Sequence, residues 1–459
     1  MSSISRRIAE FAVSLNYSDL PDEVVYQVKR FLFDSIGCAY GAMNTRDVRA
    51  MYKVLTDIGG NKEATIIGFG DELPAVNATL MNSLMVRSLD FNDIYWKQDP
   101  SHPSDLIPAA LAVGEKMSTS AKDVITAIVL AYEFEQRLCE FAVPGLRERK
   151  WHHASITQFV SPVVAGKLLG LNVDQMVNAI GIGGMHNFTL GCATAGQLTM
   201  MKNTVDPMSV HTGVFAALLA KEGYTGTEEI FEGKEGLMDV MGPEWDESKL
   251  FDGLGEKFKI LECSMKAFPT EALTHTHLSA VLKLVKENDI KPEDVEEVTI
   301  KTIARACDIL FDPHKYKPTS RETADHSLPY CIAVAIVDRK VTVQSFSEEK
   351  LKDQRVWNVI NKIKGVASEE FEKLFPAKQP SEVIIKTVDG EEYSQYLEYP
   401  KGDPREPMTD DELTDKFNAL SADILSEVKQ KEIKEAIYNF EKFGNVKDFM
   451  KILRVDKGV

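Results

Sequence analysis

The sequence predicts a mainly α-helical protein in which a large all-helical domain is joined to a smaller α/β domain. Apolar residues recur at helical spacing along most of the first 270 residues. Runs in which apolar and polar residues alternate, as in strands, follow in the second half, with a strong hairpin signal at Asp389-Gly390. The last stretch of the chain returns to amphipathic helix.

Helices are expected throughout the first part of the chain. A stripe that begins with Val24, Val25 and Val28 follows Asp19 and Pro21, which mark a helix start. Ser120-Ala-Lys-Asp123 forms a capping box before another apolar stripe. Further helices are expected over residues 74–88, 106–117, 154–170, 173–190 and 209–222, with a short extended piece over 64–69.

Gly181, Gly183 and Gly184 superficially resemble a dinucleotide-binding fingerprint. They follow a helical pattern, whereas that fingerprint requires a preceding strand. We therefore interpret them as small residues that allow close helix packing.

The smaller α/β domain is expected after Phe268-Pro269. A helix over 271–288 leads into a strand over 295–303, followed by a helix over 324–338, a capped helix from 345 to about 364, and a hairpin over 382–399. A capping box at 409–412 opens the C-terminal helices, whose apolar face needs a partner surface. The expected domains are therefore residues 1–268, 269–402 and 403–459, the last returning to the helical domain.

Composition excludes several classes of function. The chain has 459 residues and a net charge of -17, which argues against nucleic acid or an anionic membrane as a partner. Its six cysteines are widely spaced, as expected for reduced thiols in a cytoplasmic protein. The N-terminus lacks the apolar core of a signal peptide, and no apolar run is long enough to span a membrane. No zinc signature, serine-hydrolase elbow or Walker loop occurs, so we expect neither a metal nor a cofactor.

The stretch from Leu89 to Asp105 is a candidate for chemistry because it combines acids with a histidine. Pro100 and Pro103 forbid a regular helix across it, so a loop is expected. Ser104 or Asp105 can cap the following helix, which places His102 just before a helix N-terminus, a good position to meet an anion. Taken alone, the stretch is more typical of a loop whose acids face water than of a site.

Four other polar segments interrupt apolar helical surroundings: Lys150-Trp-His152-His153, Lys202 among methionines, Ser264-Met-Lys266, and Asp325-His-Ser-Leu-Pro-Tyr330. Each alone has a structural interpretation, such as a lysine that reaches water or a tyrosine that packs. Together, Asp, His, Lys and Tyr suit elimination from a polycarboxylate. Lysines in a dry pocket would stabilise the enediolate, a histidine or carboxylate would take the proton, and a second donor would assist loss of hydroxide.

The chain resembles the MmgE/PrpD family, which includes 2-methylcitrate dehydratases, cis-aconitate decarboxylases and an iminodisuccinate epimerase. The resemblance covers nearly the whole length. It is carried by Leu89-Asp-Phe-Asn-Asp93, His102-Pro-Ser-Asp105, Trp151-His152, Lys202 before Gly213-Val-Phe-Ala-Ala-Leu-Leu-Ala220, Lys266-Ala-Phe-Pro269 and Asp325-His-Ser-Leu-Pro-Tyr330. It implies a helical domain, a smaller α/β lid, an active site between them, no metal, and a homodimer.

Carried over by position, the resemblance implies a set of site residues. Asp90, His102, His152, Lys202 and Tyr330 are expected to be catalytic, and Lys266, His153, Glu271 and His275 to bind substrate. The lysines would hold carboxylates, Asp90 with His102 or His152 would handle the α-proton, and Tyr330 would donate to the departing hydroxyl.

The chain departs from the family pattern at three places. Trp151-His152-His153 stands where the family often has Phe-His-Pro, Ile94 stands where a threonine is common, and the Lys-Pro-Leu-His pattern of the decarboxylases does not follow Lys202. The expected function is dehydration of 2-methylcitrate or a similar hydroxy tricarboxylate. Decarboxylation of cis-aconitate, epimerisation of a diacid, and polycarboxylate binding without catalysis remain alternatives.

Overall fold

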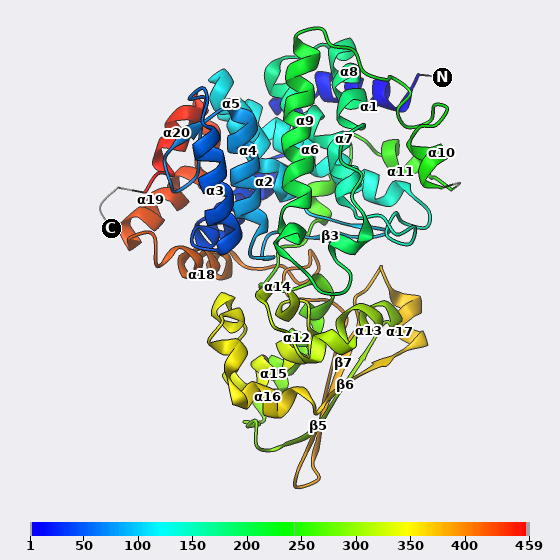
Figure 1. Ribbon diagram of the computed structural model, residues 1–459, viewed down its shortest axis with the longest axis vertical. Helices are drawn as coiled ribbons and strands as arrows, with labels where there is room; N and C mark the ends of the chain where they lie inside the picture. Colours follow the sequence, from blue (N-terminus) through cyan, green and yellow to red (C-terminus); the bar gives the residue numbers. More distant parts are fainter. Residues whose placement is uncertain (1, 243, 456–459) are drawn as a thin grey trace.

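The chain forms a large helical part and a smaller α/β part that lie one above the other (Figure 1). This computed structural model describes residues 2–242 and 244–455. Two hydrophobic cores correspond to the two parts. The first is built from residues before 266 together with residues after 407, and the second mainly from residues 272–385. A mainly α-helical fold is therefore confirmed, whereas the exact domain boundaries stay a prediction.

Helices make up most of the large part because their apolar stripes pack on one another. Val24, Val28 and Phe31 of α2 are fully buried, as the stripe predicts, and Ser120 caps α6 through the N–H of Asp123. The helices are α1 (Ile4–Ser14), α2 (Asp22–Ala42), α3 (Arg46–Ile58), α4 (Ala75–Arg87), α5 (Ile107–Met117), α6 (Ala121–Phe141), α7 (Ala154–Leu169), α8 (Val173–Gly183), α9 (Val205–Lys221), α10 (Leu237–Met241) and α11 (Ser248–Phe251).

The glycines at the C-terminal end of α8 and directly after it serve close packing, as predicted. A Cβ on Gly181 would lie 2.3 Å from the carbonyl oxygen of Thr227, and one on Gly184 would lie 2.3 Å from the Phe159 ring. The expectation that this helix extends to residue 190 is wrong, because α8 ends at Gly183. Among the described residues, no helix has the length and apolar content needed to cross a membrane.

The C-terminal helices pack on the large part. They are α18 (Asp410–Ser421), α19 (Glu427–Tyr438) and α20 (Val446–Ile452). The Phe417 ring of α18 stacks on the Phe33 ring of α2, with centroids 4.3 Å apart, and the predicted capping box of Thr409 and Glu412 is confirmed. Figure 1 shows these orange and red helices beside the blue N-terminal ones.

A four-stranded sheet forms the centre of the smaller part. Its order is β6-β5-β7-β8, with β5 parallel to β6 and antiparallel to β7. The predicted hairpin is confirmed, since β7 pairs with β8 in the register Ile384 to Ser394. The strands are β5 (Val295–Thr302), β6 (Ile363–Ala367), β7 (Ser381–Thr387) and β8 (Glu392–Leu397).

The helices of the smaller part are shorter than the sequence predicts. They are α12 (His275–Glu287), α13 (Ala304–Leu310), α14 (Arg321–Ala324), α15 (Leu328–Asp338), α16 (Gln354–Ile360) and α17 (Glu369–Leu374). The expected capped helix from 345 to 364 is wrong: two short 3₁₀ turns precede α16, and residues 363–367 form the edge strand β6. β6 lies at the edge of the sheet, and most of its residues are at least partly exposed. Its sequence therefore lacks the alternation of apolar and polar residues that would have marked a strand, and it predicts the end of a helix instead.

The predicted loop from Leu89 to Asp105 is anchored in both cores. It contains a minimal hairpin of β3 (Tyr95–Trp96) and β4 (Pro100–Ser101). Because neighbouring side chains of a strand point to opposite faces, Tyr95 enters the first core and Trp96 the second. The expected cap by Ser104 or Asp105 does not form. His102 instead precedes a 3₁₀ turn over Pro103–Leu106.

Candidate active site

A small cavity lies between the two parts and collects most of the predicted site residues. Asp90, His102, His153, Lys202, Lys266 and Glu271 line it. Arg87, Arg147, Lys315 and His326 line it as well, although the sequence did not single them out for this site. The cavity is thus lined from distant positions in the chain: by loop 89–105, by the segments around Lys202 and Lys266, and by residues of the smaller part.

Asp90 is the centre of the cluster. It is buried and adopts a left-handed backbone conformation with φ of 51°, which is uncommon for a residue other than glycine. Its carboxylate pairs with Arg87, with Lys266 at 2.9 Å and with Lys202 at 3.2 Å. Burial alone would raise the pKa of Asp90, but Lys202, Lys266 and Arg87 hold it well below its usual range. Asp90 is therefore a permanent anion and a weak base.

The two lysines differ in how their ammonium groups are satisfied. Lys266 Nζ donates to the backbone carbonyl and the carboxylate of Asp90 and to the carbonyl of Thr270, at 2.9–3.1 Å. Lys202 Nζ, although 3.2 Å from Asp90 Oδ2, makes no hydrogen bond to any described residue. Burial lowers the pKa of Lys202 to about 8. Lys202 thus has N–H groups free for a ligand, whereas Lys266 spends its three on Asp90 and Thr270.

His102 is set up to accept a proton. Its Nδ1 lies 2.7 Å from the backbone carbonyl oxygen of Asp93. Because a carbonyl only accepts, Nδ1 must carry the hydrogen, which leaves the lone pair on Nε2. Burial, with Arg87 and Lys266 nearby, lowers the pKa of His102 well below its usual value, so the imidazole is neutral. Asp93 itself is structural, since its carboxylate accepts from the backbone N–H and the hydroxyl of Ser104.

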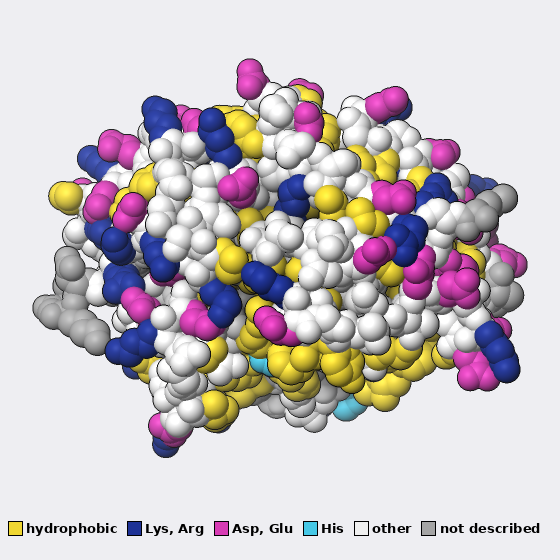
Figure 2. Space-filling view, turned by 90° about the horizontal axis from the view of Figure 1, so that it is seen from above, with side chains coloured by type: hydrophobic (Ala, Val, Ile, Leu, Met, Phe, Trp, Pro, Cys, Tyr) yellow, Lys and Arg dark blue, Asp and Glu magenta, His cyan; other side chains and the backbone are white. Residues whose placement is uncertain are grey.

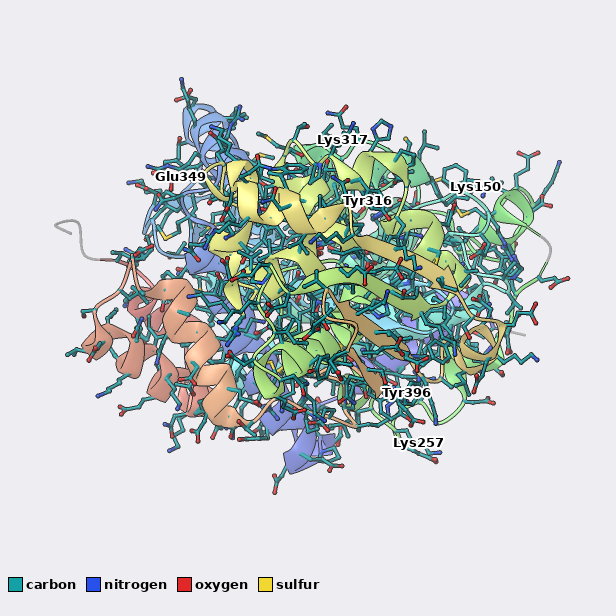
Figure 3. All side chains as sticks on the ribbon, turned by 90° about the horizontal axis from the view of Figure 1, so that it is seen from below. Lys150, Lys257, Tyr316, Lys317, Glu349 and Tyr396 are labelled. Carbon is teal, nitrogen blue, oxygen red and sulfur yellow. The ribbon has the colours of Figure 1, made fainter. Side chains whose placement is uncertain are left out.

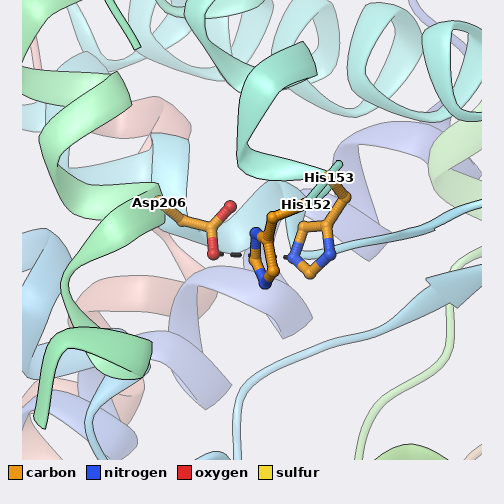
Figure 4. Close-up of side chains that lie close together, drawn as sticks. All are labelled: His152, His153 and Asp206. Carbon is orange, nitrogen blue, oxygen red and sulfur yellow. Dashed lines mark ion pairs between the residues drawn. The ribbon is translucent and has the colours of Figure 1, made fainter. Parts of the chain in front are cut away.

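His152, His153 and Asp206 form a second group (Figure 4). His153 Nε2 lies 3.5 Å from Asp206 Oδ2, and the His152 ring stacks on the His153 ring with centroids 3.9 Å apart. Burial would raise the pKa of Asp206, but His153, His152 and Arg87 lower it below its usual range. His153 lines the small cavity, whereas His152 lines the larger one next to it. Of the two histidines, His153 is therefore the one that faces Lys202 and His102.

Among residues 2–242 and 244–455, two groups of three have the donor atoms of a metal site: His152 with His153 and Asp206, and Asp90 with Asp325 and His326. Positively charged side chains already lie beside the carboxylates of both groups. Arg87 Nε lies 3.8 Å from Asp206, and Lys202, Lys266 and Arg87 surround Asp90. A divalent cation would be repelled by these charges, so both groups fit proton transfer and anion binding better than metal binding.

The structure does not bring Tyr330 or His275 to the small cavity. The Tyr330 hydroxyl donates to the carbonyl of Ser345 at 2.9 Å inside the second core, so its only proton is already engaged and a role as proton donor is not supported. His275 lines a neighbouring cavity that also touches Lys266. Burial and Lys266 lower the pKa of His275 to about 3.

Two further acids of the cluster have unusual pKa values. Burial raises the pKa of Glu271 to about 6 and that of Asp325 to about 7. Asp325 Oδ1 lies 2.5 Å from His326 Nδ1, and His326 Nε2 lies 3.9 Å from Asp90. Asp325 and His326 belong to the sequence motif that ends at Tyr330, and they lie closer to the cluster than the tyrosine does.

Arg87, Arg147, Asp206 and Lys315 were missed. Arg87 carried a weak signal, because it is the one charged residue of α4 and stands three positions before Asp90. Asp206 lies in the first turn of α9, where an acid is common for reasons of helix stability alone. Arg147 and Lys315 lie in polar segments that look like ordinary surface loops, so nothing in their neighbourhood pointed to a site.

Comparison with known families and curated proteins gives matches over most of the chain. The MmgE/PrpD N-terminal domain matches residues 6–248, and the MmgE/PrpD C-terminal domain matches residues 268–442. A cis-aconitate decarboxylase of Aspergillus terreus is 24% identical over 98% of this chain and 96% of its own. The human cis-aconitate decarboxylase is 24% identical over 93% of this chain and 89% of its own. A 2-methylcitrate dehydratase of Escherichia coli is 24% identical over 88% of this chain and 87% of its own.

Proposed function

Because the chain belongs to the MmgE/PrpD family, we propose that it is a lyase that dehydrates a hydroxy tricarboxylate of the 2-methylcitrate type. The proposal is supported by relatives that are named 2-methylcitrate dehydratase and cis-aconitate decarboxylase. The names of the relatives do not decide between dehydration and decarboxylation. We choose dehydration because the cavity holds two histidines, His102 and His153, that can act as separate base and acid.

One observation carries the choice of substrate class. The protein has a net charge of -17, yet its small cavity is lined by five cationic side chains and only two carboxylates, namely Arg87, Arg147, Lys202, Lys266 and Lys315 against Asp90 and Glu271. A buried excess of positive charge is costly unless an anion compensates it. A polycarboxylate supplies that compensation, and its charge is complementary to the cavity.

The first step is removal of the proton next to a carboxylate. His102 Nε2 is the base, because its lone pair is free and the imidazole is neutral. The C–H bond breaks, its electron pair moves into the neighbouring carboxylate, and an enediolate forms. Lys202 stabilises the new charge, since its ammonium group has no hydrogen-bond partner among the described residues. Lys266 and Arg87 act as positioning residues by holding Asp90.

The second step is loss of the hydroxyl group. His153, whose Nε2 lies 3.5 Å from the carboxylate of Asp206, acts as the general acid and donates a proton to the hydroxyl oxygen. The C–O bond breaks, water leaves, and the electron pair of the enediolate forms the carbon–carbon double bond. The rings of His102 and His153 have centroids 5.4 Å apart, so one acid and one base can act on adjacent carbons of the same substrate.

Decarboxylation of cis-aconitate is the second candidate, because the similar proteins from Aspergillus terreus and human carry that name. Incubation with 2-methylcitrate, citrate and cis-aconitate, followed by mass spectrometry, separates the two reactions. Dehydration removes the mass of one water from the hydroxy acids, whereas decarboxylation removes CO2 from cis-aconitate. Loss of CO2 without loss of water would replace the first proposal by the second.

We also propose that the protein acts as a homodimer. Apolar side chains are exposed on α9 and in the segments before it, with exposed fractions of 40–59% for Met185, Phe188, Leu190, Met201 and Phe215. Figure 2 shows hydrophobic side chains gathered along the lowest edge of that view, where charged side chains are few. Exposed apolar patches of this kind mark protein–protein contacts, and a second copy of the chain is the partner that the family resemblance implies.

A further inference from the structure

The small cavity is too small for the proposed substrate. It offers about 40 Å³, which is room for a few water molecules, since one water needs about 10–15 Å³. The cavity next to it offers about 420 Å³, which is within the range of about 300–1,000 Å³ that small-molecule sites occupy. A second neighbouring cavity, which shares Ile94, Trp96 and Lys266 with the small one, offers about 260 Å³. A substrate whose reacting carbon lies beside Lys202 must therefore extend out of the small cavity, and the larger neighbour offers the most room for it.

Four residues line both cavities and form the junction between them: Arg147, Thr194, Ile309 and Lys315. Lys150, which lines only the larger cavity, is exposed and lies on the side of the molecule opposite the C-terminal helices (Figure 3). The larger cavity thus reaches the surface, and a molecule that extends from Lys202 through this cavity towards solvent passes Arg147 and Lys315.

Arg147 and Lys315 are cations that form no direct pair with an acid of the described residues, although the charge of Glu271, which lines the same small cavity, acts on both. Within the described part of the chain, neither side chain makes an ion pair or a hydrogen bond, whereas Arg305 in the same cavity pairs with Glu148. Lys315 is only 2% exposed, and an unpaired ammonium group in such a place is costly without an anion. An anionic ligand at the junction would satisfy both residues at once.

Hydrogen bonds hold the backbone of both Arg147 and Lys315 in place. The N–H of Arg147 donates to Asp99 at 3.0 Å, which anchors the residue to the large part. Lys315 lies in a 3₁₀ turn over Pro313–Tyr316, and its carbonyl accepts a hydrogen bond from the Ser327 hydroxyl. The two cations therefore approach the junction from opposite parts of the molecule.

We propose that Arg147 and Lys315 form a second carboxylate subsite, which binds the carboxylate furthest from the reacting carbon and so selects tricarboxylates over dicarboxylates. The inference rests on the proposed function, since it assumes that the reacting end of the substrate lies beside Lys202. Arg147 offers a planar fork that matches a carboxylate, and Lys315 adds a point charge. The third carboxylate thereby contributes binding free energy that a substrate without it lacks.

Titration calorimetry with two unreactive acids tests the subsite. Propane-1,2,3-tricarboxylate has no hydroxyl group to lose, and succinate lacks its third carboxylate arm. The wild-type protein should bind the tricarboxylate more tightly than succinate. Arg147→Gln and Lys315→Met should each weaken tricarboxylate binding by about tenfold or more, as expected for one charge-assisted hydrogen bond, and leave succinate binding unchanged. Lys317→Met is the matched control, because Lys317 is exposed and lines neither cavity.

Unchanged tricarboxylate binding in both variants would overturn the subsite, as would an equal loss in the Lys317 control. Equal affinity of the wild-type protein for the two acids, or no binding of the tricarboxylate, would overturn it as well. Because calorimetry does not depend on turnover, binding that behaves as expected in a protein that dehydrates no hydroxy acid would refute only the proposed reaction. Thermal unfolding of each variant verifies its fold, and either of the two variants suffices for the test.

Discussion

Lys266 holds Asp90 twice, through the backbone carbonyl at 3.1 Å and through the carboxylate at 2.9 Å. This double contact fixes a residue whose φ of 51° is unfavourable by itself. The two lysines therefore differ in role. Lys266 holds Asp90 in place, whereas Lys202 contacts the same carboxylate without a hydrogen bond and keeps its N–H groups for a ligand.

Replacing Lys266 by methionine should therefore mainly lower stability, whereas replacing Lys202 should mainly lower the reaction rate. Lys266→Met breaks a buried ion pair and should lower the free energy of unfolding by about 3–5 kcal/mol. Lys202→Met should change stability by less, since Asp90 keeps Lys266 and Arg87, but should reduce kcat by about 10²–10³ through loss of enediolate stabilisation. Denaturant unfolding and steady-state kinetics measure both, and a stable, fully active Lys202→Met protein would contradict the mechanism.

Asp90→Asn should destabilise the protein most at neutral pH. Asparagine tolerates the left-handed conformation, so the change removes charge without backbone strain. The pKa of Asp90 is depressed in the folded protein, so its stabilising contribution is present above the ordinary carboxyl pKa and is lost as the pH falls towards the folded value. The difference in unfolding free energy between wild type and variant should therefore shrink in acid. A difference that is independent of pH would show that Asp90 acts through shape alone.

The activity should decline in alkaline solution because Lys202 loses its proton. Burial lowers the pKa of Lys202 to about 8, so above that pH the folded protein holds an uncharged amine that stabilises an enediolate poorly. In Lys202→Arg the group stays charged, and the alkaline decline of kcat/KM should move to higher pH even if the maximum is lower. An unchanged alkaline limb would assign it to another group.

The two adjacent histidines should differ in importance. His153→Gln removes the group that lines the small cavity and pairs with Asp206, so kcat should fall by about 10²–10⁴, as is typical for a general acid. His152→Gln should have a smaller effect, since His152 lines only the larger cavity, and it serves as the matched control. Asp206→Asn should resemble His153→Gln and shift the pH profile of kcat. A greater loss in His152→Gln would reverse the assignment.

Phe215→Lys should dissociate the proposed dimer. Phe215 is 49% exposed on α9, and a charge at the centre of an apolar interface is strongly unfavourable. Light scattering after gel filtration should give twice the chain mass for the wild-type protein and the single chain mass for the variant. Val54→Lys on α3, where Val54 is 55% exposed, is the control and should remain a dimer. A monomeric wild-type protein would refute the proposal.

Local sequence patterns were sufficient for much of the fold. Helical periodicity and caps located most helices of the large part, because a stripe of apolar residues and a capping side chain act within a few residues of chain. The hairpin at Asp389-Gly390 was identified for the same reason. The sequence pattern gave the wrong secondary structure where tertiary contacts determine it. Residues 363–367 continue a helical run in the sequence but form an edge strand, because pairing with β5 satisfies their backbone hydrogen bonds.

The candidate site divides in the same way. The sequence by itself, through residue types and a family resemblance, determined that Asp90, His102, Lys202 and Lys266 belong together, and that the protein is an acidic, mainly helical chain. Only the tertiary structure decided that His153 rather than His152 faces the cavity, that Tyr330 is engaged in the second core, and that Arg147 and Lys315 stand unpaired at the junction. Hydrogen bonds and burial depend on residues that lie far apart in the chain, and these contacts set which side chains are free and which are charged.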